Sequence, residues 1–91
     1  MIDYGMAGKV ALVTGAGGGI GRATALGFAR SGAAVLVCDV NDEAGAETVA
    51  LIGSQGGKAA FQHCDVSDPA QVKAMVAAAV STFGGLDYAF N

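Results

Sequence analysis

Apolar residues occur in this chain as short runs separated by longer stretches of mixed composition. Two runs, Lys9–Thr14 and Ala34–Asp39, are rich in β-branched residues and nearly free of polar side chains, as expected of strands buried on both faces. A third run, Ala59–Asp65, carries Phe61 in its middle, and a fourth run covers Leu86–Asn91. The pattern therefore predicts four strands.

Helical spacing is found between these runs. The first predicted helix covers Ile20–Ser31 and ends at Gly32, a residue type favoured just after a helix. The second begins after Asn41, which suits an N-cap position. Its apolar face is formed by residues at positions i, i+4, i+7 and i+8, namely Ala44, Thr48, Leu51 and Ile52.

The third predicted helix has the clearest start signal. Asp68 suits the N-cap, Pro69 suits the first helical position, and Gln71 stands where a capping box requires it. Its apolar stripe comprises Val72, Met75, Val76, Ala79, Val80 and Phe83. Strands and helices thus alternate along the chain, which predicts a parallel sheet with right-handed crossovers in a doubly wound α/β fold of the Rossmann type.

A glycine-rich turn, T-G-A-G-G-G-I-G at Thr14–Gly21, joins the first predicted strand to the first predicted helix. Glycine allows a tight turn with positive φ and lets the backbone come close to a pyrophosphate. The following helix offers unpaired N–H groups and the positive end of its dipole to such an anion. We expect Gly21 to serve close packing between helix and strand. A P-loop is excluded, because Arg22 follows the last glycine where a lysine is required.

A carboxylate stands at the end of the second predicted strand. Asp39 lies where, in this fold, an acid beside the glycine turn accepts hydrogen bonds from the ribose hydroxyls of the adenosine half of a dinucleotide. Its charge would repel the 2′-phosphate of NADP, and neither Gly18 nor Val40 offers a basic side chain to bind that group. The sequence therefore predicts NAD as the cofactor. The alternative is that Asp39 only caps the next helix.

Other polar and sulfur-containing positions carry weaker signals. Asp65 ends the third predicted strand and could accept a hydrogen bond from the adenine amino group, or bond to nearby backbone. His63 has no partner recognisable in the sequence, and we assign it a structural role. Cys38 and Cys64 lie in apolar runs, and we interpret them as buried, reduced cysteines of a cytoplasmic protein rather than metal ligands.

Charge and composition narrow the possible functions. The net charge is −3 and no basic run occurs, which argues against a nucleic-acid partner. The sequence contains no apolar run long enough to predict a membrane span. Met1–Tyr4 carries no cationic segment of the kind that begins a secretory signal. Tyr4 and Tyr88 are assigned to packing. With 53% hydrophobic and 14% charged residues, the 91-residue chain is apolar for an independent small domain, which predicts that it is part of a larger one.

Four motifs in a fixed order resemble those of the short-chain dehydrogenase/reductase family, and the resemblance extends from Lys9 to the end of the chain. The glycine turn matches the family pattern T-G-x-x-x-G-x-G at Thr14, Gly15, Gly19 and Gly21. The other three motifs are Asp39 after V-L-V-C, D-V at Asp65-Val66, and L-D-Y-A-F-N at Leu86–Asn91.

The resemblance implies a role for each motif. Gly18–Ile20 would contact the pyrophosphate, Asp39 the adenosine ribose, and Asp65 with Val66 the adenine. Asn91 resembles the first residue of the family's N-N-A-G segment, whose backbone borders the cofactor. The full set of predicted cofactor-binding residues is Gly15, Gly17, Gly18, Gly19, Ile20, Asp39, Val40, Asp65, Val66 and Asn91.

The resemblance also implies an activity. Enzymes of this family interconvert a secondary alcohol and a ketone, using a serine, a Tyr-x-x-x-Lys pair and a further asparagine that follow the segment seen here. We therefore expect residues 1–91 to be the N-terminal part of the Rossmann domain of an NAD-dependent oxidoreductase, a homotetramer or dimer whose partner is a small alcohol or ketone. Two alternatives are a non-catalytic dinucleotide-binding or sensor module and an α/β domain without a ligand.

Overall fold

The computed structural model describes residues 5–91, so Tyr4 lies outside the described part of the chain. Strands and helices alternate in the predicted order. The elements are β1 (Val10–Val13), α1 (Gly19–Arg30), β2 (Ala34–Asp39), α2 (Asp42–Ser54), β3 (Lys58–His63), α3 (Pro69–Phe83) and β4 (Tyr88–Phe90).

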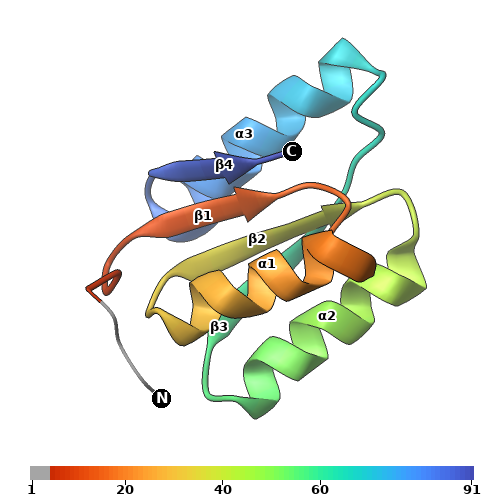
Figure 1. Ribbon diagram of the computed structural model, residues 1–91. Helices are drawn as coiled ribbons and strands as arrows, with labels where there is room; N and C mark the ends of the chain where they lie inside the picture. Colours follow the sequence, from red (N-terminus) through yellow and green to blue (C-terminus); the bar gives the residue numbers. More distant parts are fainter. Residues whose placement is uncertain (1–4) are drawn as a thin grey trace.

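The strands form one parallel sheet in the order β3-β2-β1-β4 (Figure 1). The chain moves outward from β1 through β2 to β3 and then crosses back to place β4 on the other side of β1. The direction of winding therefore reverses between β1 and β4, which confirms the doubly wound parallel sheet. In open sheets of this kind, ligands bind beyond the carboxyl ends of the strands at such a reversal.

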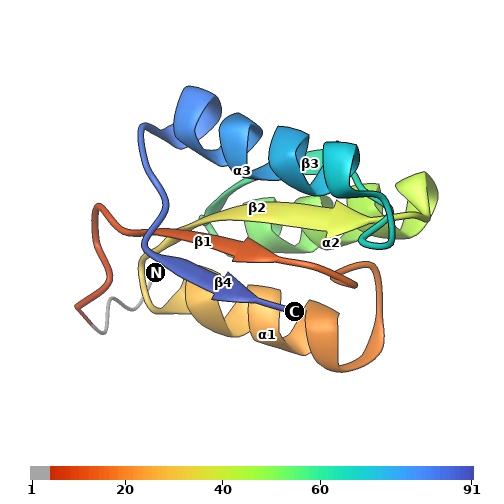
Figure 2. The ribbon, with the colours of Figure 1, turned by 90° about the horizontal axis from the view of Figure 1, so that it is seen from above.

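Helices cover both faces of the sheet (Figure 2). On one face, α1 and α2 pack against the side chains of Val13, Val35 and Val37 through the fully buried Ala25, Ala29 and Ile52. On the other face, α3 packs Met75 and Ala79 against a cluster that includes Leu12, Leu36, Cys38 and Cys64. Because successive strand residues point to opposite faces, β1 and β2 are apolar at nearly every position.

The helix ends agree with the start and stop signals in the sequence. The side chain of Asn41 accepts a hydrogen bond from the Ala44 N–H, and that of Asp68 from the Ala70 N–H, so both residues are the N-caps predicted. Gly32 follows α1 with a φ of 106°, a left-handed conformation that glycine adopts at little cost.

Some predicted positions differ from the structure. Leu51 is exposed on α2, because Gly45, Thr48 and Ile52 form the buried line instead. Val76 and Val80 are exposed on α3, since this helix touches the sheet along the narrower line of Met75 and Ala79 and no other described helix lies on that face. The third strand ends at His63, two residues before Asp65, although the Cys64 N–H still bonds to the Asp39 carbonyl oxygen.

The two cysteines are buried and unpaired, as predicted, although Cys64 lies just beyond β3. Burial, followed by the neighbouring Cys64 and Asp39, raises the pKa of the Cys38 thiol to about 12, so this thiol stays protonated and unreactive at neutral pH. Within residues 5–91, no group of His, Cys, Asp or Glu side chains is arranged to hold a metal ion. Every helix in the same range is too short or too polar to form a membrane span.

Candidate cofactor-binding site

The glycine turn lies at the carboxyl edge of the sheet, next to the reversal of winding. The Thr14 N–H donates to the Phe90 carbonyl oxygen at 2.9 Å, and the Thr14 hydroxyl lies 3.5 Å from the Asn91 side-chain oxygen. Strand β4 therefore places Asn91 directly beside the turn. The residues predicted from the first and the last motif are brought together by this pairing.

Two glycines give the turn its shape. Gly15 and Gly19 have φ values of 63° and 55°, in the left-handed region that other residues adopt at a cost. Gly21 has a different role. A Cβ atom on Gly21 would lie 2.0 Å from the Gly15 carbonyl oxygen, so only glycine lets α1 begin this close to the preceding turn. The close-packing role predicted for Gly21 agrees with this geometry.

The N-terminus of α1 has no cap from the protein itself. Its N-cap residue is Gly18, which has no side chain, and the first turn contains no acid. In the described part of the chain, no acceptor is found for the N–H groups of Gly18, Gly19 and Ile20. Such groups at a helix start carry a partial positive charge and are satisfied by water or by an anion. Gly18–Ile20 are also exposed, so an anion can reach them.

The Asp39 carboxylate is held beside the turn by two backbone hydrogen bonds. Its Oδ2 atom accepts from the Gly17 N–H at 2.8 Å, and its Oδ1 atom accepts from the Asn41 N–H at 2.9 Å. Each oxygen keeps a further acceptor site for a ligand hydroxyl. Because Asn41 is the N-cap of α2, Asp39 does not serve as that cap.

Gly17 explains how Asp39 can come so close. A Cβ atom on Gly17 would lie 2.8 Å from Asp39 Oδ2 and 2.9 Å from Ala44 Cβ, distances at which something must move. Gly17 is buried between Asp39 and Ala44. Its neighbour Gly18 is exposed, and a Cβ atom on Gly18 would meet nothing within 4 Å. The glycine run therefore serves two purposes, close approach at Gly17 and an open helix start at Gly18.

Apolar side chains surround this edge of the sheet. Ile20 is 77% exposed, while Val40 and Val66, which follow Asp39 and Asp65, are each 60% exposed. All three belong to the predicted cofactor-binding set. Exposed side chains of this size beyond the carboxyl ends of the strands offer apolar surfaces on which a planar base can lie.

The Asp65 carboxylate is partly used by its own loop. Its Oδ1 atom accepts from both the hydroxyl and the backbone N–H of Ser67, at 2.7 and 2.9 Å, and these bonds lower the pKa of Asp65 below its ordinary value. No partner is found for Oδ2 among the described residues. The local bonding foreseen as an alternative is therefore present, and one oxygen still faces no protein donor.

Two parts of the site are not apparent from the sequence motifs. Arg22 and Thr48 bond to the carbonyl groups of the glycine turn, from α1 and α2 respectively. The only signal for these bonds is that the hydroxyl of a buried threonine on α2 must find an acceptor. His63, for which the sequence shows no recognisable partner, has one in the structure, because its Nδ1 atom lies 2.7 Å from Asp42 Oδ1 on the exposed surface.

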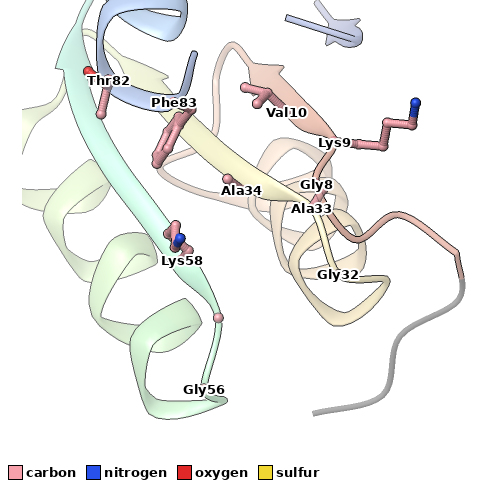
Figure 3. A pocket seen from close by; sticks show the side chains of 11 residues that line it. Gly8, Lys9, Val10, Gly32, Ala33, Ala34, Gly56, Lys58, Thr82 and Phe83 are labelled. Carbon is pink, nitrogen blue, oxygen red and sulfur yellow. The ribbon is translucent and has the colours of Figure 1, made fainter. Parts of the chain in front are cut away.

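A cavity of about 460 Å³ opens at the opposite edge of the sheet, near the amino ends of β1, β2 and β3 and the end of α3 (Figure 3). Glycine, alanine and the side chain of Phe83 form much of its wall, and its two charged residues, Lys9 and Lys58, are exposed. It has no carboxylate and lies away from the winding reversal. The carboxyl edge is therefore the better candidate site.

Comparison with known proteins defines the class of this fold and site. The family model described as short chain dehydrogenase matches residues 9–91, and the chain belongs to this family. It is 51% identical over 86 residues to a 2,5-dichloro-2,5-cyclohexadiene-1,4-diol dehydrogenase of Sphingobium indicum and 52% identical over 83 residues to a cyclohexanol dehydrogenase of an Acinetobacter species. These matches cover 94% and 91% of the chain and 33% of each relative.

A solved structure shows the same similarity. The chain superposes on a hydroxysteroid dehydrogenase from Escherichia coli with a TM-score of 0.90 and 38% sequence identity, over 92% of this chain and 36% of that one. The chain thus spans about a third of the length of the relatives it matches. The family and the fold predicted from the sequence are confirmed by these matches.

Proposed function

We propose that this chain is the dinucleotide-binding part of an NAD-dependent oxidoreductase that interconverts a secondary alcohol and a ketone. The observation that carries the proposal is the uncapped start of α1, where the N–H groups of Gly18, Gly19 and Ile20 have no described acceptor and stand next to the anchored carboxylate of Asp39. Family membership supports a nicotinamide dinucleotide, NAD or NADP, as the ligand.

The residues present fit such a ligand. The N–H groups of Gly18–Ile20 would hold the pyrophosphate, and the glycines around them leave room for its oxygens. Val40 and Val66 would border the adenine, with the free Oδ2 atom of Asp65 available to its amino group, and Asn91 would lie near the bound dinucleotide beside Thr14. When bound, the nicotinamide accepts or donates the hydride. Within residues 5–91, the chain supplies binding and orientation.

Asp39 supports NAD over NADP. Its two oxygens already accept backbone N–H groups, which hold the carboxylate in place beside the turn, where it can also accept the ribose hydroxyls. A 2′-phosphate at the same position would meet this negative charge. Arg22, the nearest guanidinium to the turn, donates to Gly17, Ala44, Thr48 and Glu47 and so is engaged elsewhere.

The wider assignment follows the relatives. Because they are about three times as long as this chain, we propose that residues 1–91 form the N-terminal part of a larger Rossmann domain and that the catalytic residues follow it. Relatives named for a cyclohexadienediol and for cyclohexanol support a small cyclic alcohol or its ketone as the substrate class. We further propose a cytoplasmic homo-oligomer, a tetramer or dimer.

Titration of the full-length protein with NAD and NADP, followed by an assay of cyclohexanol oxidation, tests this proposal. We expect binding of both dinucleotides with a preference for NAD, and NADH formation in the presence of the alcohol. Binding of NAD without turnover of any secondary alcohol would favour the non-catalytic module instead. Failure to bind either dinucleotide would contradict both functions and leave an α/β domain without this ligand.

A further inference from the structure

The glycine turn is held from behind by two side chains, one from α1 and one from α2. The fully buried Thr48 hydroxyl donates to the Ala16 carbonyl oxygen at 2.7 Å, and Arg22 Nη2 donates to the Gly17 carbonyl oxygen at 2.6 Å. The two side chains are joined, because Arg22 Nε donates to Thr48 Oγ1 at 2.9 Å. Two consecutive carbonyl groups are thus fixed by one connected pair.

We propose that Arg22 and Thr48 are positioning residues that set the direction of the Gly17 and Gly18 N–H groups toward the dinucleotide, an inference that rests on the proposed function. In a planar trans peptide the C=O and the N–H of the next residue point in opposite directions. Fixing the Ala16 carbonyl therefore directs the Gly17 N–H, and fixing the Gly17 carbonyl directs the Gly18 N–H.

The observed directions agree with this argument. The Gly17 N–H points to Asp39 Oδ2, which it reaches at 2.8 Å. The Gly18 N–H, opposite the carbonyl held by Arg22, has no described acceptor and faces the open side of the turn. Thr48 thereby acts on the ribose-binding carboxylate through Gly17, while Arg22 acts on the first of the N–H groups proposed to meet the pyrophosphate.

The side chains of this hydrogen-bond network differ in how far they are buried. The Arg22 side chain is only 24% exposed, and its Nη2 atom also donates to the Ala44 carbonyl oxygen at 3.1 Å, so the guanidinium is wedged between α1 and α2. Its ion pair with Glu47 is at the surface, where the Glu47 side chain is 62% exposed, and exposed pairs of this kind contribute little. Glu47 therefore offers a matched control within the same network.

The experiment compares Arg22→Met and Thr48→Val with Arg22→Lys, Thr48→Ser and Glu47→Gln in the full-length protein. Arg22→Met keeps the aliphatic stem and Thr48→Val keeps the shape, but both remove the donors. We expect the Kd for NAD to rise about tenfold in each, since one or two hydrogen bonds that fix the turn are lost. Thr48→Ser and Glu47→Gln should stay within about twofold of the parent, and Arg22→Lys should fall in between.

Adenosine, which has no phosphate, distinguishes positioning from general damage. Its affinity should be unchanged by Arg22→Met, because this change acts on the Gly18 N–H. In the unliganded Thr48→Val protein, the Gly17 amide should exchange with solvent faster than in the parent. Equal losses for NAD and adenosine in Arg22→Met, or an unchanged Kd for NAD in both donor-deleted variants, would overturn the inference.

The test also separates this inference from the function on which it rests. A parent protein that binds neither NAD nor NADP contradicts the proposed function. The exchange rate of the Gly17 amide in Thr48→Val then still decides whether Thr48 holds the turn, and an unchanged rate would refute that role as well.

Discussion

Helices α1 and α3 both begin at the carboxyl edge of the same sheet, yet their first turns differ in every polar contact. At α3, Asp68 accepts from the Ala70 N–H, Pro69 removes one donor, and Gln71 donates to Asp68 Oδ2 while accepting from the Asp65 N–H. At α1, a glycine occupies the N-cap position and the donors that follow are open. One helix start is completed by its own side chains, and the other leaves its backbone donors without a described acceptor.

The difference shows how a binding site can be recognised in a fold that repeats the same unit. Relative to a glycine at the N-cap, a side-chain cap stabilises a helix by a few tenths of a kcal/mol, and α1 does without that contribution. Arg22 and Thr48 fix the turn from behind instead, on the side away from the open N–H groups. The stability forgone at the helix start is consistent with a role in binding an anion.

The largest expected effect comes from giving α1 the kind of cap that α3 has. Gly18 is extended, with φ −171° and ψ 175°, and a Cβ there would meet nothing within 4 Å, so Gly18→Asp fits the backbone. The new carboxylate would satisfy the N–H groups and repel a pyrophosphate. We expect NAD binding to weaken by roughly a hundredfold, while the unliganded protein gains a few tenths of a kcal/mol.

Gly18→Ala is the matched control for this change, because it adds the same Cβ without a charge. We expect its Kd for NAD to stay within about threefold of the parent, as no clash is present. Isothermal titration and thermal denaturation measure the two quantities. NAD binding that survives Gly18→Asp would show that the pyrophosphate is not bound at this helix start.

The second comparison sets Asp39 against Asp68, two acids at the same edge of the sheet. Asp39→Ala should weaken NAD binding by about 10- to 100-fold, the effect of losing a charge-assisted hydrogen bond, and should narrow the preference for NAD over NADP. Asp68→Ala should instead cost about 1 kcal/mol of unfolding free energy with the preference unchanged. Titrations with both dinucleotides measure the ratio, and an unaltered ratio in Asp39→Ala would refute its assigned role.

A smaller effect is expected at Gly17. Gly17→Ala would place a Cβ 2.8 Å from Asp39 Oδ2, so the carboxylate or α2 must shift. We expect a loss of about 1 to 3 kcal/mol of stability and a weakening of NAD binding by about tenfold. Denaturant unfolding and NAD titration, each beside Gly18→Ala, measure this. Equal behaviour of the two variants would mean that the close approach of Asp39 is unimportant.

The smallest effect concerns Asp65, whose pKa is lowered by the hydrogen bonds from Ser67. Ser67→Ala removes the hydroxyl and should raise the pKa of Asp65 part of the way to its ordinary value of 3.8, as followed by NMR titration of the carboxyl carbon. A lowered pKa favours the ionised group, so its stabilisation is present above the ordinary value and is lost as the pH falls through the lowered one. The melting temperatures of parent and variant should therefore converge at acid pH.

Much of the fold could be predicted from the sequence because local signals and burial agree. Asn41 and Asp68 are the N-caps expected, and Leu12 and Leu36 are buried in the strands expected. The exposure of Leu51 and Val80 could not be predicted in this way. An apolar stripe on a helix shows which residues are apolar but not how wide a strip of the helix the neighbouring sheet covers.

The arrangement of the candidate site could be predicted only in part. The glycine turn and Asp39 are close in sequence to the elements that place them, so their spacing identifies them. The bonds of Thr48 to Ala16 and of Arg22 to Thr48 join residues 32 and 26 positions apart, and no local pattern indicates such a pairing. The cofactor-binding roles stay predictions for all ten residues: Gly15, Gly17, Gly18, Gly19, Ile20, Asp39, Val40, Asp65, Val66 and Asn91.

A crystal structure of the full-length protein with NAD tests the central claim most directly. We predict that pyrophosphate oxygens accept hydrogen bonds from N–H groups among Gly18, Gly19 and Ile20, and that both oxygens of Asp39 face the adenosine ribose. A dinucleotide bound elsewhere on the protein, with those N–H groups bonded only to water, would contradict the account.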